Sequence, residues 1–175
     1  MKTFRTILLL GNLLAFSMLA ASEETARIAP TVSLTALVAP EGTPANLGQV
    51  QAFIVRGNIQ LVDSNGNTTA LKRGQIFTEG NTIKTGADSQ VLLVFSNGAA
   101  LKVVANSEVK VTLFRQEPFN IEDEGAFLRL ARDPSRSNVI LDVHNGKLGG
   151  TVKELNKDAG STFLVNGPAE INGVL

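Results

Sequence analysis

The stretch of sequence that decides the fold runs from Leu71 to Leu113 and reads LKRGQIFTEGNTIKTGADSQVLLVFSNGAALKVVANSEVKVTL. Its glycines recur at a fixed step between short apolar segments, at Gly74, Gly80, Gly86 and, after twice that interval, Gly98. Val91 to Phe95 is apolar on both faces, as a strand covered on two sides must be. Other apolar residues alternate with polar neighbours and need only one covered face, namely Leu101, Val103, Val109, Val111 and Leu113. The stretch therefore predicts a core built from short β-strands.

Turn signals extend this pattern to the rest of the chain. Asn-Gly, the strongest short hairpin signal because both residues tolerate a positive φ, occurs five times. The pairs begin at Asn65, Asn97, Asn145, Asn166 and Asn172. We interpret a set of residues as structural turn positions, with a positive φ at the glycines of the recurring series. The set is Gly74, Gly80, Gly86, Asn97, Gly98, Asn145 and Gly146.

The predicted fold class is all-β, with short strands in two facing sheets and one long irregular excursion. The sheets are wound as an irregular β-solenoid or closed as a β-sandwich. The two arrangements differ in whether Val91 to Phe95 neighbours strands adjacent in sequence along coils or pairs across Greek-key connections. The excursion is expected from Arg115 to Asn138, which contains an acidic cluster and two prolines but no period-two pattern. Within it, Glu122 to Leu130 carries a weak signal for a helical turn.

Strand signals become dense where the folded domain is expected to begin, near Gln49. Ile59 to Asp63 and Thr68 to Leu71 are predicted to pair as a hairpin around the Asn65-Gly66 turn. Further strands are expected at Val50 to Ile54, Val139 to Val143, Leu148 to Leu155, Thr162 to Val165 and Ala169 to Ile171.

Composition limits the class of protein. At 175 residues with 43% hydrophobic content, the chain has room for one sizeable core but hardly for two. Lys plus Arg equals Asp plus Glu at 16 each, so no net field attracts nucleic acid, and nucleic-acid binding is disfavoured. Cysteine, Trp and Tyr are absent, which removes disulfides and thiolate chemistry.

The N-terminus has the order of a secretory signal peptide. Lys2 and Arg5 precede the apolar run Ile7 to Leu19, and the small residues Ala20 to Ser22 follow it. The run is shorter than the roughly 20 residues that a spanning helix needs, so no stable membrane span is expected after cleavage. We therefore predict a signal peptide over residues 1–22 and a periplasmic or secreted product.

Between the signal peptide and the domain, residues 23–48 are rich in Ala, Thr and Pro and predict an extended linker. Val32 to Val38 has the composition of one edge strand within it. The domain itself is predicted over residues 49–175.

No catalytic constellation stands out in the sequence. His144 is the only histidine, and it shares a strand face with Asp142, while Ser137 or Ser161 is a conceivable nucleophile. The favoured interpretation is a surface histidine at the end of a strand, before the Asn145-Gly146 turn. We expect no enzyme activity, no cofactor and no metal site, because a single histidine cannot build a multi-histidine zinc site.

Two acidic features have simple interpretations. Asp63 to Asn67 mimics the opening of a calcium loop, but Thr68 occupies the position of the sharp-turn glycine, so a hairpin turn is favoured. Glu122 to Glu124 is an acidic run in a loop, and such runs are usually solvated rather than metal-bound. The recurring glycines lack the Lys-Ser or Lys-Thr pair of a phosphate-binding loop.

Several motifs together resemble the FecR-type periplasmic domain family. Gly80-Asn81-Thr82-Ile83-Lys84-Thr85-Gly86, the apolar strand to Phe95, Asn97-Gly98 and the run from Leu101 to Val109 follow that family's order. In the second half, Leu141 to Leu148, then Ser161-x-Phe163-x-Val165 and Pro168-Ala169, are similar as well. The resemblance implies a non-catalytic sensing or binding module in the bacterial envelope, engaging a protein or envelope ligand, with a part in transmembrane signalling. The alternative is a structural surface or assembly protein without a regulated ligand.

The sequence departs from the family pattern near its end. Gly167 precedes Pro168 where members carry Thr-Pro, and the closing strand of the pattern is not found before Leu175. Members of the iron-transport signalling type also carry a cytoplasmic segment and a membrane span, so the resemblance implies the stand-alone secreted variety. We expect an open strand edge, through which the domain self-associates or accepts a strand from a partner.

Overall fold

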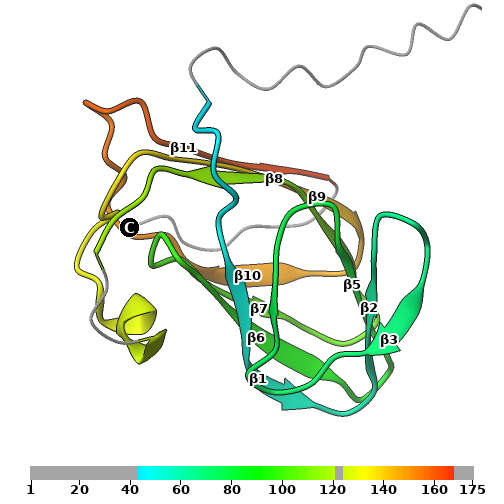
Figure 1. Cartoon of the computed structure of the whole chain (residues 1–175). Helices are drawn as coiled ribbons and strands as arrows, with labels where there is room; N and C mark the ends of the chain where they lie inside the picture. The colour runs from blue at the N-terminus through cyan, green and yellow to red at the C-terminus, as the bar shows by residue number, and fades with distance from the viewer. Residues whose placement is uncertain (1–42, 121–123, 168–175) are drawn as a thin grey trace, which may run out of the picture. The chain divides into compact units, whose positions relative to one another are not determined.

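A computed structural model describes residues 43–120 and 124–167, apart from the side chains of residues 124–126. The regular secondary structure of the described chain is almost entirely β-strand (Figure 1). They are β1 (Val50–Arg56), β2 (Ile59–Val62), β3 (Thr68–Ala70), β4 (Ile76–Phe77), β5 (Thr82–Thr85), β6 (Gln90–Phe95), β7 (Ala100–Val103), β8 (Glu108–Gln116), β9 (Ser137–Asn145), β10 (Leu148–Thr151) and β11 (Thr162–Asn166), with a 3₁₀ helix η1 (Glu124–Arg129) before β9.

The strands form two sheets, which confirms the predicted all-β class. One sheet has the order β10-β7-β6-β1-β4, and the other has the order β11-β9-β8-β5-β2-β3. Their inward side chains form one common core. Among the named strands, every pair is antiparallel except β11 with β9. Successive coils of a solenoid would stack in parallel, so the arrangement is that of a β-sandwich.

Three phenylalanines join the two sheets at the centre of the core. Phe95 of β6 lies with its ring centroid 5.4 Å from that of Phe114 in β8 and 6.1 Å from that of Phe163 in β11. Phe95 is fully buried, as predicted, and Val94 on the opposite face of β6 is buried too. Tilted and edge-on aromatic pairs of this kind add to the energy of burial.

One face assignment in β8 was wrong. The alternation of the sequence placed Leu113 on the inner face with Val109 and Val111. The pairing of β8 with β9 shifts register between Val111 and Leu113, so Phe114 takes the inner position and Leu113 is only half-buried. A β-bulge inserts one residue and moves the following side chains to the other face.

The hairpin between β2 and β3 confirms the interpretation of Asp63 to Asn67 as a turn. The Asp63 carboxylate accepts hydrogen bonds from the backbone N–H of Asn65 at 2.8 Å and of Asn67 at 2.9 Å, and Gly66 has a φ of 85°. Hydrogen bonds from the side chain and backbone of Asn67 lower the pKa of Asp63 from its usual value. The Asp63 carboxylate therefore stabilises the turn in which it lies.

The positive φ predicted for the turn glycines is confirmed at most of them. Gly74, Gly80, Gly98 and Gly146 have a positive φ, whereas Gly86 does not, so the expectation for Gly86 was wrong. At Gly86 the constraint is space, because an added Cβ would lie 3.3 Å from the carbonyl oxygen of Asn58. Asn97 lies in the turn after β6, and Asn145 ends β9 before Gly146.

Several boundaries differ from the sequence expectation. The excursion is shorter at both ends, because β8 continues to Gln116 and β9 begins at Ser137. The helical turn expected within the excursion is present as the 3₁₀ helix η1. The strand expected at Leu148 to Leu155 ends at Thr151.

The expected linker also ends earlier than residue 48, because Asn46 and Gly48 hydrogen-bond to β8. The signal peptide, the strand expected at Val32 to Val38 and the strand expected at Ala169 to Ile171 lie outside the described residues. Within the described ranges, no helix has the length and apolar character needed to cross a membrane.

Candidate functional site

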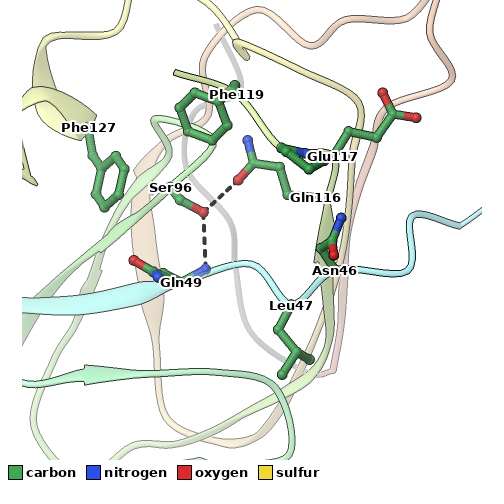
Figure 2. A pocket seen from close by; sticks show the side chains of 9 residues that line it. Asn46, Leu47, Gln49, Ser96, Gln116, Glu117, Phe119 and Phe127 are labelled. Carbon is green, nitrogen blue, oxygen red and sulfur yellow. Dashed lines mark hydrogen bonds between the residues drawn. The ribbon is translucent and has the colours of Figure 1, made fainter. Parts of the chain in front are cut away.

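A cavity of about 350 Å³ lies where β6 and β8 end (Figure 2). Its walls come from four places. Asn46, Leu47 and Gln49 belong to the segment that leads into β1, Ser96 follows β6, and residues 116–119 leave β8 for the excursion. Phe127 of η1 completes the lining. The volume is at the lower end of the range in which proteins bind small ligands or single side chains.

Ser96 and Gln116 form a fixed polar centre in this cavity. The Ser96 backbone N–H donates to the carbonyl oxygen of Gln49 at 2.8 Å, and the Gln49 N–H donates to Ser96 Oγ at 3.1 Å. Ser96 Oγ in turn donates its one proton to Gln116 Oε1 at 2.5 Å. With Oε1 on Ser96, the Gln116 amide presents Nε2 away from this chain of hydrogen bonds.

The amide nitrogen of Gln116 has no hydrogen-bond partner among the described residues. The side chain is only 4% exposed, and Nε2 is a buried donor. Figure 2 shows this nitrogen pointing away from Ser96, on the side of Phe119. Because a buried donor without an acceptor costs about 1–3 kcal/mol, the site gains stability when a ligand supplies an acceptor.

The remaining lining selects for a neutral, partly apolar ligand. The rings of Phe119 and Phe127 and the ring of Pro118 supply apolar surface, while the exposed Glu117 is the ionised side chain at the rim. A carboxylate at the rim disfavours anionic ligands, and the apolar walls disfavour burial of a charge of either sign. The arrangement suits a carbonyl or hydroxyl oxygen on Gln116 Nε2 with an aromatic or aliphatic group beside it.

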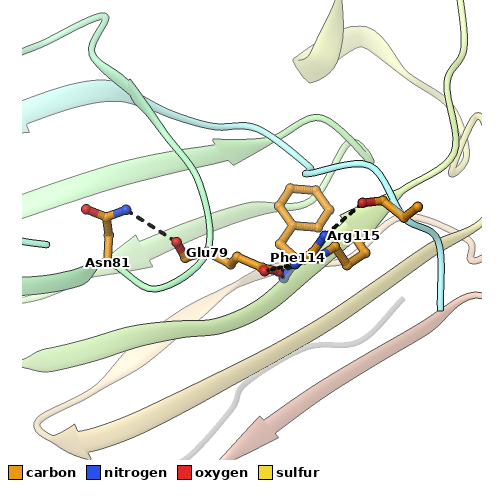
Figure 3. Close-up of polar contacts among 5 residues, drawn as sticks. Glu79, Asn81, Phe114 and Arg115 are labelled. Carbon is orange, nitrogen blue, oxygen red and sulfur yellow. Dashed lines mark hydrogen bonds and ion pairs between the residues drawn. The ribbon is translucent and has the colours of Figure 1, made fainter. Parts of the chain in front are cut away.

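A forked ion pair holds one wall of the cavity in place (Figure 3). Glu79 Oε2 accepts from the Phe114 backbone N–H and from Arg115 Nε, both at 2.9 Å, and Glu79 Oε1 pairs with the Arg115 Nη2. Arg115 also donates from Nη1 to the Ala45 carbonyl oxygen at 2.7 Å. The Glu79–Arg115 pair therefore ties the segment before β1, which lines the cavity, to the middle of the larger sheet.

A second polar cluster is buried beside the start of β9. Asp133 is 2% exposed and accepts from Ser137 Oγ at 2.7 Å, while Ser161 Oγ accepts from the Ser137 N–H at 3.0 Å. Asn97 Nδ2 donates to Ser137 Oγ at 3.2 Å. Desolvation raises the pKa of Asp133, and its Oδ1 has no partner in the described chain. The cluster joins the excursion to β9 and β11.

The residues considered for a hydrolase are not brought together. Ser137 and Ser161 meet at Asp133, whereas His144 is exposed at the far end of β9, about 20 Å away at the rise of an extended strand. Asp142 accepts instead from Thr112 Oγ1, and from Asn166 Nδ2 at 3.0 Å. The favoured interpretation of His144 as a surface residue at a strand end is confirmed.

The described ranges contain no group of three or more His, Asp or Glu side chains placed to hold a metal ion. Of the acidic run, Glu122 and Asp123 lie outside the described residues, as does the side chain of Glu124.

Sequence reasoning missed Ser96, Gln116 and Phe119. The one available signal was that they border the break in strand rhythm, next to the turn at Asn97 and at the start of the excursion. Comparisons with protein-family models, with curated proteins and with solved structures found no match.

Proposed function

We propose that this protein is an exported, non-catalytic binding module of the FecR-like kind, which engages a protein or envelope ligand in the bacterial envelope and has a part in signalling there. The observation that carries the proposal is the cavity at Gln116. It combines a buried, fixed and unpaired hydrogen-bond donor with apolar walls, which is the usual composition of a ligand site.

The order of the motifs also supports the FecR-like part of the proposal. The Gly80 to Gly86 motif contains β5, the apolar motif is β6, and the Asn97-Gly98 turn joins β6 to β7. These three pieces of the resemblance therefore coincide with strands and with the turn between them. A net charge of 0 provides no attraction for nucleic acid.

The proposal is tested by titrating the isotope-labelled protein with N-acetyl-phenylalanine amide, a neutral probe that carries one ring and two carbonyl groups. We expect the side-chain amide resonances of Gln116 to shift on binding. Gln116→Met should weaken binding about tenfold, the effect of losing one good hydrogen bond. Ser96→Ala removes the same hydrogen bond to Gln116 but keeps Nε2, so it should weaken binding less than Gln116→Met does. No shift at millimolar probe would contradict the proposed site.

Export is tested by N-terminal sequencing of the secreted or periplasmic product. The small residues at Ala20 to Ser22 should place the new N-terminus at Ser22, Glu23 or close by. Recovery of the intact chain from Met1 in the membrane fraction would overturn this part of the proposal.

A second candidate function is a structural or assembly role through self-association. The observation in its favour is β11, which pairs with β9 on one side and has no other strand partner among the described residues. Leu164 in β11 is 50% exposed. Light scattering should then show association that Leu164→Lys reduces, because a charge on an edge strand opposes pairing. A native chain that is monomeric at high concentration would remove this candidate.

A further inference from the structure

The cavity adjoins a short strand edge whose outer backbone groups have no partner among the described residues. Asn46 to Gly48 pairs antiparallel with the end of β8, through Gly48 N–H to the Phe114 carbonyl at 2.9 Å and Gln116 N–H to the Asn46 carbonyl at 3.0 Å. Leu47 is bridged to Arg115 between these two bonds. In this arrangement the N–H and C=O of Leu47 point away from β8.

Those two groups have no hydrogen-bond partner in the described part of the chain. Leu47 is also 50% exposed and borders the cavity. Figure 2 shows its side chain pointing away from Gln116, as expected for a strand whose neighbouring residues face the cavity. A free donor and a free acceptor at one residue are what an added strand requires.

We propose that the ligand of this site is an extended, neutral peptide segment of a partner protein, which adds one strand to the edge at Leu47 and places a large apolar side chain in the cavity at Gln116. This inference rests on the function proposed above and specifies its ligand class. It accounts together for the backbone pair of Leu47 that has no partner among the described residues and for the rings of Phe119 and Phe127.

The register of such a strand follows from sheet geometry. Cross-strand neighbours share a face, so the peptide residue opposite Leu47 points outward with it. That residue exchanges both backbone hydrogen bonds with Leu47. The next residue along the peptide faces inward, beside Asn46 or Gly48, where its side chain enters the cavity.

The Glu79–Arg115 pair has a role in this arrangement. By holding the Ala45 carbonyl and the Phe114 N–H, it keeps the segment from Asn46 to Gly48 extended against β8 before any ligand arrives. A preformed edge lowers the ordering cost of binding. Glu117 at the rim opposes acidic segments, and the apolar walls disfavour burial of a charge of either sign, so the partner segment is neutral.

The test uses the peptide acetyl-Thr-Gln-Phe-Gln-Thr-amide and a version with both Gln backbone nitrogens methylated. N-methylation blocks pairing with Leu47 but keeps the phenylalanine side chain. We expect the unmodified peptide to shift the resonances of the Leu47 amide and of the Gln116 side chain together, and to bind about tenfold more tightly than the methylated one.

Two variants of the protein complete the test. Leu47→Pro removes the free N–H without breaking an existing hydrogen bond, and Leu47→Ala is the matched control that keeps it. Tighter binding of the unmodified peptide to the Leu47→Ala form than to the Leu47→Pro form supports the inference.

The outcomes separate the inference from the proposed function. Equal binding of both peptides, with shifts at Gln116 but none at Leu47, overturns the strand addition while the binding site stands. Shifts at neither residue, with this peptide and with N-acetyl-phenylalanine amide, overturn both. If Leu47→Pro instead converts a dimer to a monomer, the occupant is a second copy of this chain and the peptide inference is wrong.

Discussion

The aromatic centre of the core and the polar end of the sandwich at Gln116 adjoin where β6 ends, but they are built on different principles. At the aromatic centre, Phe95 packs against both Phe114 and Phe163 between the sheets. At the end, serine, glutamine and aspartate side chains are buried instead. The buried side-chain atoms without a hydrogen-bond partner in the described chain all belong to residues from Gln116 to Asn138. The aromatic centre stabilises the fold by burying apolar side chains. The polar end instead retains buried polar atoms without a hydrogen-bond partner among the described residues, which is typical of ligand sites.

The largest expected effect tests the centre. Phe95→Ala removes a fully buried ring and leaves a cavity between two others, so it should lower the free energy of unfolding by about 3–5 kcal/mol. Lys102→Ala in β7, an exposed neighbour, should cost under about 0.5 kcal/mol. Denaturant unfolding of both variants measures the difference in free energy of unfolding. Equal losses would mean that the buried position of Phe95 and the exposed position of Lys102 are wrongly assigned.

The next effect concerns the connection between the two regions. Glu79→Gln removes the charge that holds Arg115 and the segment before β1, and should lower the free energy of unfolding by about 1–2 kcal/mol. Glu108→Gln is the matched control, because Glu108 pairs with Lys84 at 3.1 Å on a more exposed surface. Its cost should be about 0.5 kcal/mol or less. A larger loss in the control would show that the Glu79–Arg115 pair does not have a special role.

A smaller effect distinguishes the two aspartates by their pH dependence. Desolvation raises the pKa of Asp133 above its usual 3.8, so the native state keeps a proton there that the unfolded chain has already lost. Stability contributed by this group is therefore lost as the pH rises from about 4 toward neutral. Asp63, whose pKa is lowered by the hydrogen bonds of its turn, has the opposite sign and loses its contribution as the pH falls.

Denaturant unfolding at a series of pH values checks these signs. The stability of the Asp133→Asn form relative to the wild type should increase with pH, and that of the Asp63→Asn form should decrease. The same sign for both variants would contradict the assigned environments.

How far the sequence predicts the structure also differs between the two regions. At the centre, the period-two alternation of apolar residues and the Asn-Gly turns lead directly to the strands, because burial of one face has a simple signature. The bulge in β8 broke that rule at Leu113, since no residue type announces an inserted residue. At the polar end, Ser96 and Gln116 are 20 positions apart in sequence and meet only through the sandwich. Their pairing leaves no periodic signal, so sequence reasoning could place the excursion but not the site within it.

The smallest expected effect is at His144, and it separates binding from catalysis. His144 is exposed at the end of β9 opposite to the Ser137 end, which pairs with Gln116. His144→Ala should therefore leave the affinity for N-acetyl-phenylalanine amide, and any hydrolysis of 4-nitrophenyl acetate, unchanged within error, and should shift stability by under about 0.5 kcal/mol. Gln116→Met is the comparison, since it should weaken binding of the same probe about tenfold. A saturable esterase activity that disappears in the His144→Ala form would overturn the non-catalytic proposal, because it would make the exposed strand end, and not the polar end of the sandwich, the functional region of the molecule.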